Sequence, residues 1–183
     1  MSEKTYNTSN TLTDTNLPSI IPQGVIDTID DLDVEYHLTQ IIGYYNLVKN
    51  AGHILQTCEF YQYILNHYYV FGSIQFVLRK DIFIHYVSVI ETLVIYKGFN
   101  LEYKDKNNEP IRMKNLLDNN DFCKKVPIES NLKQEILSFY NKRNKIHLNR
   151  APENELTQDD FSQDDIDQVR NLLKRISDLL YTH

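Results

Sequence analysis

The segment FYNKRNKIHLNRAP, residues 139–152, holds an arginine, an asparagine and a histidine within five positions. Arg143 and Asn144 are adjacent, and His147 follows closely. A guanidinium can hold a phosphate through paired hydrogen bonds, and a histidine can move protons because its pKa lies near neutrality. An asparagine amide can orient either group. These residue types predict a site that binds an anion and transfers protons.

Cationic side chains surround these three residues, although the protein as a whole is acidic. The formal net charge is −6, yet residues 124 to 150 include seven basic residues and only two acidic ones, a local charge of +5. Net charge would not draw the whole molecule to nucleic acid, so any such binding needs this local patch. Lys142, Lys145 and Arg150 lie nearest to His147 in the chain and are the candidate anion-binding cations.

Helical periodicity places the basic residues at the end of an otherwise apolar face. On a predicted helix over residues 131–148, one face holds Leu132, Ile136, Phe139 and Tyr140. Arg143 and His147, four residues apart, fall on the same face. A cation on a face that should be buried needs an acidic partner, a cleft or a second subunit. Glu91 is the candidate partner, because it is nearly alone as a charge in VSVIETLVIY.

Two plainer interpretations stay open. Basic residues near the end of a helix complement its dipole, and Arg143 with Glu91 could be an ordinary buried ion pair. The histidines at positions 37, 53, 67 and 85 are expected to be packed or at the surface. A metal site built from His85, Glu91 and His147 has no supporting spacing. We therefore expect no metal and no cofactor.

The sequence RNKIH on a late helix, with a lone glutamate on an earlier apolar helix, resembles the HEPN (higher eukaryotes and prokaryotes nucleotide-binding) superfamily. By this resemblance Arg143, Asn144 and His147 match the family's motif, and Glu91 matches its acidic residue. The gap between Arg143 and His147 is shorter than usual. HEPN proteins are α-helical, generally dimeric, and often metal-independent endoribonucleases in toxin–antitoxin, phage-defence and RNA-processing systems.

The resemblance implies a specific reaction. The 2′-hydroxyl of RNA would attack the adjacent phosphorus while His147 moves protons and Arg143 offsets the charge on the phosphate. It implies RNA as the substrate, Lys142, Lys145 and Arg150 as RNA-binding residues, and a homodimer in which two motifs face each other. An antitoxin or another regulatory protein is a further candidate partner. The alternative is a non-catalytic bundle that serves dimerisation or partner binding.

The elements that must position these residues are predicted to be helices. We expect an all-α, HEPN-like bundle of four to five main helices over residues 26–183, after a flexible tail at residues 1–25. The expected helices are a first helix through residue 55, continued by 58–71; an apolar central helix at 74–97 that stops at Gly98; a short helix at 113–121; the helix at 131–148; and a last helix capped by Ser162 and Asp165.

Composition predicts a cytoplasmic location. The chain has 183 residues, of which 42% are hydrophobic and 24% charged, which is ordinary for a soluble globular protein. Cys58 and Cys123 lie far apart and are expected to be reduced thiols. The most apolar stretch, residues 70–96, contains five charged or titratable side chains, so we expect no membrane partner.

Overall fold

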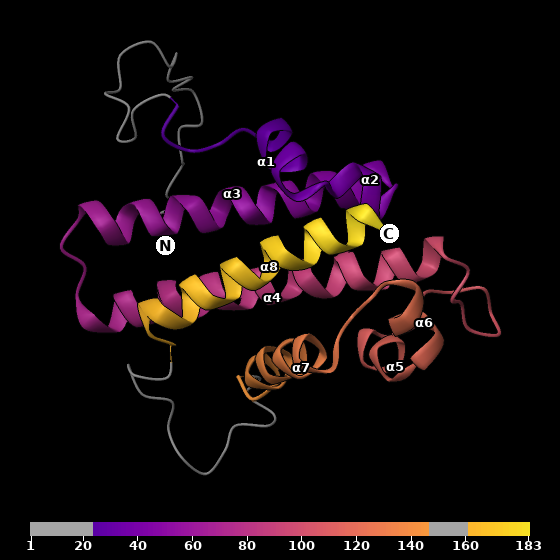
Figure 1. Ribbon diagram of the computed structural model, residues 1–183. Helices are drawn as coiled ribbons and strands as arrows, with labels where there is room; N and C mark the ends of the chain where they lie inside the picture. Colours follow the sequence, from indigo (N-terminus) through magenta and orange to yellow (C-terminus); the bar gives the residue numbers. More distant parts are fainter. Residues whose placement is uncertain (1–23, 147–160) are drawn as a thin grey trace, which may run out of the picture.

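The computed structural model describes residues 24–146 and 161–183, and its regular elements there are helices (Figure 1). The prediction of an all-α fold is therefore confirmed for the described part of the chain. The flexible tail predicted for residues 1–25 lies almost wholly outside that part. The helices are α1 (Ile29–Tyr36), α2 (Leu38–Ile42), α3 (Tyr45–His67), α4 (Gly72–Asn100), α5 (Met113–Asp118), α6 (Asn120–Lys125), α7 (Ser130–Asn144) and α8 (Gln163–Thr182).

The long helices α3, α4 and α8 lie alongside one another and enclose the core (Figure 1). The helix α4 packs against both of the others, and its residues Phe83, Ile90 and Leu93 are fully buried. The apolar stripe predicted on the last helix faces this core, since Ile166 and Leu173 are 0% exposed. The central position predicted for the apolar helix is confirmed.

The first predicted helix is in fact divided into three. His37 and Gly43 both adopt left-handed backbone conformations, with φ of 53° and 74°. Both residues end helices, at the C-caps of α1 and α2, and a glycine adopts this conformation without steric cost. Asp33 supports the first break by accepting bonds from the backbone N–H and the hydroxyl of Thr39. The predicted continuation through residue 58 is confirmed, because α3 is unbroken from Tyr45 to His67.

Gly98 does not stop the central helix, contrary to the prediction. The helix α4 continues to Asn100, and Gly98 is buried within it. A Cβ atom at position 98 would lie only 2.7 Å from Cδ1 of Leu116, so this glycine allows α5 to approach α4 closely. The end of α4 is secured by Asn100, whose side-chain amide donates to the Ile41 carbonyl over 2.9 Å.

The remaining helices differ from prediction mainly at their ends. The short helix expected at 113–121 is two helices, since Asn119 ends α5 and caps α6. The capping box predicted for Ser162 and Asp165 is present at the start of α8. The helix predicted over 131–148 begins as expected but ends at Asn144.

The length and composition of α4 alone would let it cross a membrane, and no other helix in the described ranges has this property. Half of its most apolar window is buried inside the bundle. A core helix of a soluble protein has the same properties, so this observation is weak support for a membrane span.

Candidate functional site

The candidate site is built around an ion pair between α7 and α4. The Arg143 Nη2 atom donates to Oε2 of Glu91 over 2.6 Å. The side chains of Arg143 and Glu91 are only 16% and 24% exposed, so each charge depends on the other for much of its solvation. The contact predicted from the two isolated charges is therefore confirmed.

The packing of α7 on α4 brings this arginine to the glutamate. Ile136 is buried, and the ring of Phe139 lies 5.8 Å from the ring of Phe83 on α4. Arg143 follows one turn after Phe139, on the same side of the helix. Its guanidinium also lies 5.0 Å from the centre of the Tyr140 ring, in cation–π contact.

One donor of this arginine is not used by the described residues. The Nε atom of Arg143 is buried and has no hydrogen-bond partner there. Such a group carries a desolvation cost, and an anionic oxygen is the acceptor that a guanidinium binds best. The guanidinium is thus only partly satisfied by Glu91.

The helix α7 ends earlier than the sequence predicted. The N–H of Lys145 bonds to the carbonyls of Asn141 and Lys142, and the N–H of Ile146 bonds to the carbonyl of Arg143. These contacts close the helix with a tighter turn after Asn144. The prediction that one helix carries both Arg143 and residue 147 was therefore wrong. His147 and Arg150 themselves lie outside the described residues.

Lys142 is engaged with the start of α8. Its ammonium lies 2.7 Å from Oδ1 of Asp165 and 5.2 Å from the centre of the Phe161 ring. Burial acts to raise the pKa of Asp165, but hydrogen bonds from Lys142 and Ser162 outweigh it, so the pKa is lowered. This contact joins α7 to the capping box of α8, and sequence patterns did not indicate it.

The positive charge of residues 124–150 is therefore partly neutralised by other elements. Asp118 pairs with Lys133 over 2.9 Å, in addition to the pairs at Lys142 and Arg143. Lys145 is exposed. Of the candidate RNA-binding cations in the described ranges, Lys145 projects most freely, and Lys142 would have to leave Asp165 to contact a ligand.

No three His, Cys, Asp or Glu side chains in the described ranges gather in a way that could hold a metal ion. The alternative site of His85, Glu91 and His147 includes a residue outside those ranges. It therefore stays an alternative based on the sequence.

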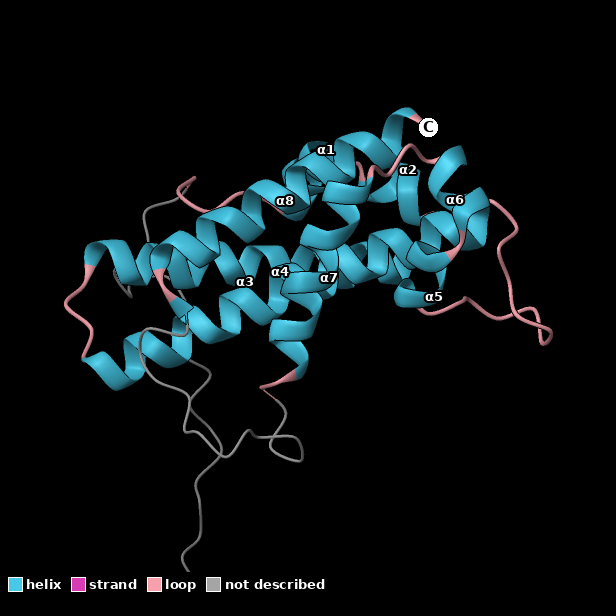
Figure 2. Ribbon diagram, turned by 60° about the horizontal axis from the view of Figure 1, so that its bottom comes forward, coloured by secondary structure: helices cyan, strands magenta, loops and turns pink. Residues whose placement is uncertain are grey.

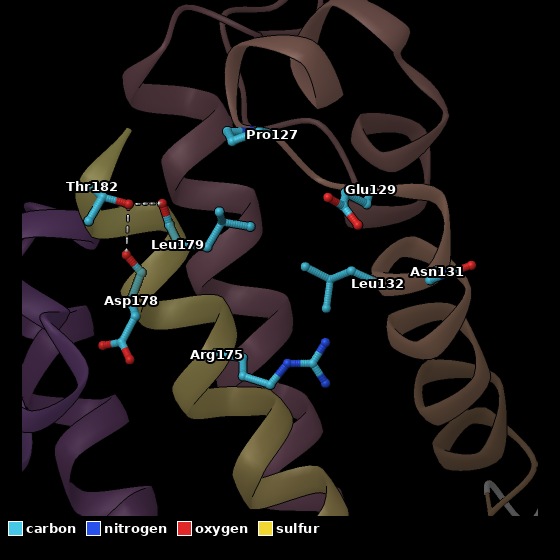
Figure 3. Close-up of a pocket in the computed structure, with 8 residues that line it drawn as sticks. All are labelled: Pro127, Glu129, Asn131, Leu132, Arg175, Asp178, Leu179 and Thr182. Carbon is cyan, nitrogen blue, oxygen red and sulfur yellow. Dashed lines mark hydrogen bonds between the residues drawn. The ribbon is translucent and has the colours of Figure 1, made fainter.

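A groove lies at the opposite end of α7, between α7 and α8 (Figure 3). Its volume is about 690 Å³, and Leu132 and Leu179 line it from the two helices. Arg175 binds both carboxylate oxygens of Glu135, at 3.1 and 2.9 Å. The Thr182 hydroxyl is bonded to backbone carbonyls of α8. These polar groups are already paired, and the groove includes neither Arg143 nor Glu91.

The chain is an all-α protein with a partly buried arginine–glutamate pair at the junction of two helices. No family model, no curated protein and no solved structure matches this chain.

Proposed function

We propose that this protein is a metal-independent endoribonuclease of the HEPN type, acting in phage defence, a toxin–antitoxin system or a stress response. The observation that carries the proposal is Arg143, which Glu91 holds in place while its buried Nε donor has no partner among the described residues. A fixed guanidinium with an unused donor suits a phosphate oxygen. The likeness of RNKIH to the HEPN motif supplies the choice of RNA.

The proposed reaction needs only groups of the chain. His147 takes the proton from the 2′-hydroxyl as that oxygen bonds to the adjacent phosphorus. The bond between phosphorus and the 5′-oxygen breaks, and a histidine returns a proton to the leaving oxygen. Arg143 offsets the charge on the phosphate oxygens, and Asn144 orients the phosphate. The products are a 2′,3′-cyclic phosphate and a free 5′-hydroxyl.

The proposal includes a homodimer located in the cytoplasm, with an antitoxin or another regulatory protein as a further partner. Two arginine–histidine sites would then face each other near the end of α7. Lys142, Lys145 and Arg150 would contact the RNA backbone, which gives affinity without sequence readout.

The test is cleavage of a single-stranded RNA by purified protein, with and without EDTA. His147→Ala should lower the rate by about 100- to 10,000-fold, the usual contribution of a general acid–base histidine. Arg143→Ala should lower both RNA affinity and turnover, because its charge acts in both states. The matched control is His53→Ala, which removes an exposed histidine of α3 and should leave the rate unchanged.

Two results would overturn the mechanism. Loss of cleavage in EDTA would favour metal chemistry. Equal rates for the wild type and His147→Ala would remove the histidine from the reaction, provided that circular dichroism shows both proteins folded.

A non-catalytic helical bundle is the second candidate, and two observations favour it. Glu91 binds Arg143 at 2.6 Å, and α7 ends before residue 147. The pair would then be structural, and the protein would act through dimerisation or partner binding. Absence of RNA cleavage, together with a cellular effect that survives His147→Ala, would select this candidate.

A further inference from the structure

A polar cleft lies between α1 and α8, two helices that contact each other along one side of the bundle (Figure 2). Its volume is about 470 Å³, which falls within the range of about 300–1,000 Å³ that is usual for small-molecule sites. All of its lining residues carry polar side chains: Glu35, Tyr36, Asp167, Arg170, Asn171 and Lys174. The cleft includes neither Arg143 nor Glu91, so it is separate from the proposed nuclease site.

Arg170 is a cation of this cleft that has no acidic partner among the described residues. Its side chain is partly buried, and it takes part in none of the ion pairs of the described ranges. It acts instead on the phenol of Tyr36, which is 2% exposed. Burial raises the pKa of Tyr36 to about 12, and a hydrogen bond with Arg170 only moderates this rise. The phenol is therefore neutral near pH 7, and the charge of Arg170 stays available to a ligand.

Glu35 is the corresponding acid on the α1 side of the cleft. It is also partly buried, and it too is absent from the ion pairs of the described ranges. Its charge acts to raise the pKa of Tyr36, so it lies near the same phenol as Arg170. Two opposite charges thus line one cleft without pairing with each other. Charges that are partly removed from water and left unpaired are costly, and a ligand that carries both charges would remove this cost.

The other charged side chains of the cleft are already engaged. The Lys174 ammonium donates to Oδ1 of Asp178 over 2.6 Å and to the backbone carbonyl of Glu35 over 3.0 Å. The second of these bonds holds the end of α1 against α8. The Asp167 carboxylate is exposed and accepts a hydrogen bond from Nε2 of Gln163 over 3.1 Å. The unpaired guanidinium and the unpaired carboxylate described above are therefore the two charges that the cleft offers to a ligand.

We propose that this cleft binds a small zwitterion of the class of a free amino acid, whose carboxylate bonds to Arg170 and whose ammonium bonds to Glu35. A guanidinium binds a carboxylate through paired, charge-assisted hydrogen bonds. The side-chain amide of Asn171, on the same wall as Arg170, can donate or accept a further bond. A simple anion would be repelled by Glu35, and a simple cation would be repelled by Arg170. The polar lining favours a small polar ligand side chain over a large apolar one.

The first test is thermal unfolding of the full chain in the presence of each of the standard L-amino acids. A concentration of about 10 mM is about ten times the Kd of roughly 1 mM that a ligand of so few atoms attains. At this excess the bound ligand should raise the Tm by about 3–6 °C for a chain of this length. Acetate, methylammonium and inorganic phosphate at the same concentration carry one kind of charge each, and each should have a smaller effect.

The second test assigns the two charges of the ligand to the two residues. The amino acid that raises the Tm most is titrated calorimetrically, beside the analogue in which hydrogen replaces its ammonium group. The wild type should prefer the amino acid by about 10- to 100-fold, the usual contribution of a charge-assisted contact. Glu35→Gln should remove this preference. Arg170→Lys should weaken the binding of both compounds, because a lysine keeps the charge but loses the paired donors.

The matched control is Glu129→Gln, which makes the same change at an exposed carboxylate of the α7–α8 groove (Figure 3). It should bind the amino acid as the wild type does, and loss of binding there would move the ligand to that groove and overturn the proposal. The proposal also fails if no amino acid raises the Tm, if acetate or phosphate raises it equally, or if Glu35→Gln keeps the preference. Circular dichroism shows whether each variant is folded, and Glu35→Gln alone decides if Arg170→Lys is not. RNA cleavage should be unchanged in all three variants, which separates this site from the nuclease.

Discussion

Arg143 and Glu91 form a contact that matters for stability as well as for chemistry. Removing the carboxylate would leave a partly buried cation without its partner. We expect Glu91→Ala to lower the free energy of unfolding by about 1–3 kcal/mol. The double variant Glu91→Ala with Arg143→Met should recover part of that loss, because no charge is then left unpaired. Urea unfolding of the wild type, both single variants and the double variant measures the coupling.

The pair between Arg175 and Glu135 provides a control for this prediction. The Arg175 side chain is 56% exposed, and exposed pairs contribute at most about 1 kcal/mol. Glu135→Ala should therefore cost less than Glu91→Ala. Equal losses would mean that Glu91 does no more for the fold than a surface carboxylate.

The contacts of individual residues were predictable where a charge stood alone. Arg143 and Glu91 each interrupt an apolar face, so each needed the other, and their contact could be inferred without coordinates. Lys142 and Asp165 lie in polar stretches where many partners are available. Their pairing depends on how α7 and α8 are placed in space, which periodicity within one helix does not determine.

At the scale of elements, the start of α8 should make stability depend on pH. The folded state holds the pKa of Asp165 below its ordinary value, so its contribution is complete above the unfolded value and is lost as pH falls through the folded value. We expect Asp165→Asn to lower the free energy of unfolding by about 1–2 kcal/mol at pH 7. The difference should shrink below about pH 4. Urea unfolding at pH 7 and pH 3 measures both values.

The capping box of α1 gives the matched comparison. Asp31 also has a lowered pKa because its carboxylate accepts hydrogen bonds from the hydroxyl and the backbone N–H of Thr28. No cationic side chain in the described part of the chain is hydrogen-bonded to this carboxylate as Lys142 is to Asp165. Asp31→Asn should therefore have the smaller effect. If the two variants behave alike, the Lys142 contact adds nothing to the cap.

The position of a helix was predictable where the period of its hydrophobic residues and its capping residues indicated the same boundaries, as in α8. They were not predictable where an unusual backbone conformation decides the boundary. His37 ends α1 with a positive φ, a backbone conformation that is uncommon for residues other than glycine. Glycine often ends a helix, but Gly98 lies inside α4. A glycine stands there because a larger side chain would collide with Leu116 of α5. Such contacts between helices distant in the chain have no signature in a local pattern.

At the scale of the whole molecule, an acidic protein that binds RNA through a few cations should be sensitive to salt. Single strands give a slope of about 0.7 per phosphate contact in log affinity against log salt. The four proposed phosphate contacts come from Lys142, Arg143, Lys145 and Arg150. Together they would give a slope of at most about 3. Lys145→Ala should reduce the slope by about 0.7. Fluorescence anisotropy of a labelled RNA at several KCl concentrations measures it.

Lys106 supplies the control for this measurement. It is exposed in the loop between α4 and α5, outside the basic segment of residues 124–150. Lys106→Ala should leave the slope unchanged. A slope that depends on Lys106 but not on Lys145 would place the RNA on another surface.

The central position of α4 also has a consequence for synthesis on the ribosome. The helix α3 precedes α4 in the chain, but α8, which covers α4 from another side, begins only at Gln163. At about 5–20 residues per second, the interval between Asn100 and Gln163 lasts about 3–13 seconds. During that time an apolar helix of 29 residues lacks one of its covering helices. We therefore expect the nascent chain to bind chaperones that recognise exposed apolar segments until translation delivers the last helix.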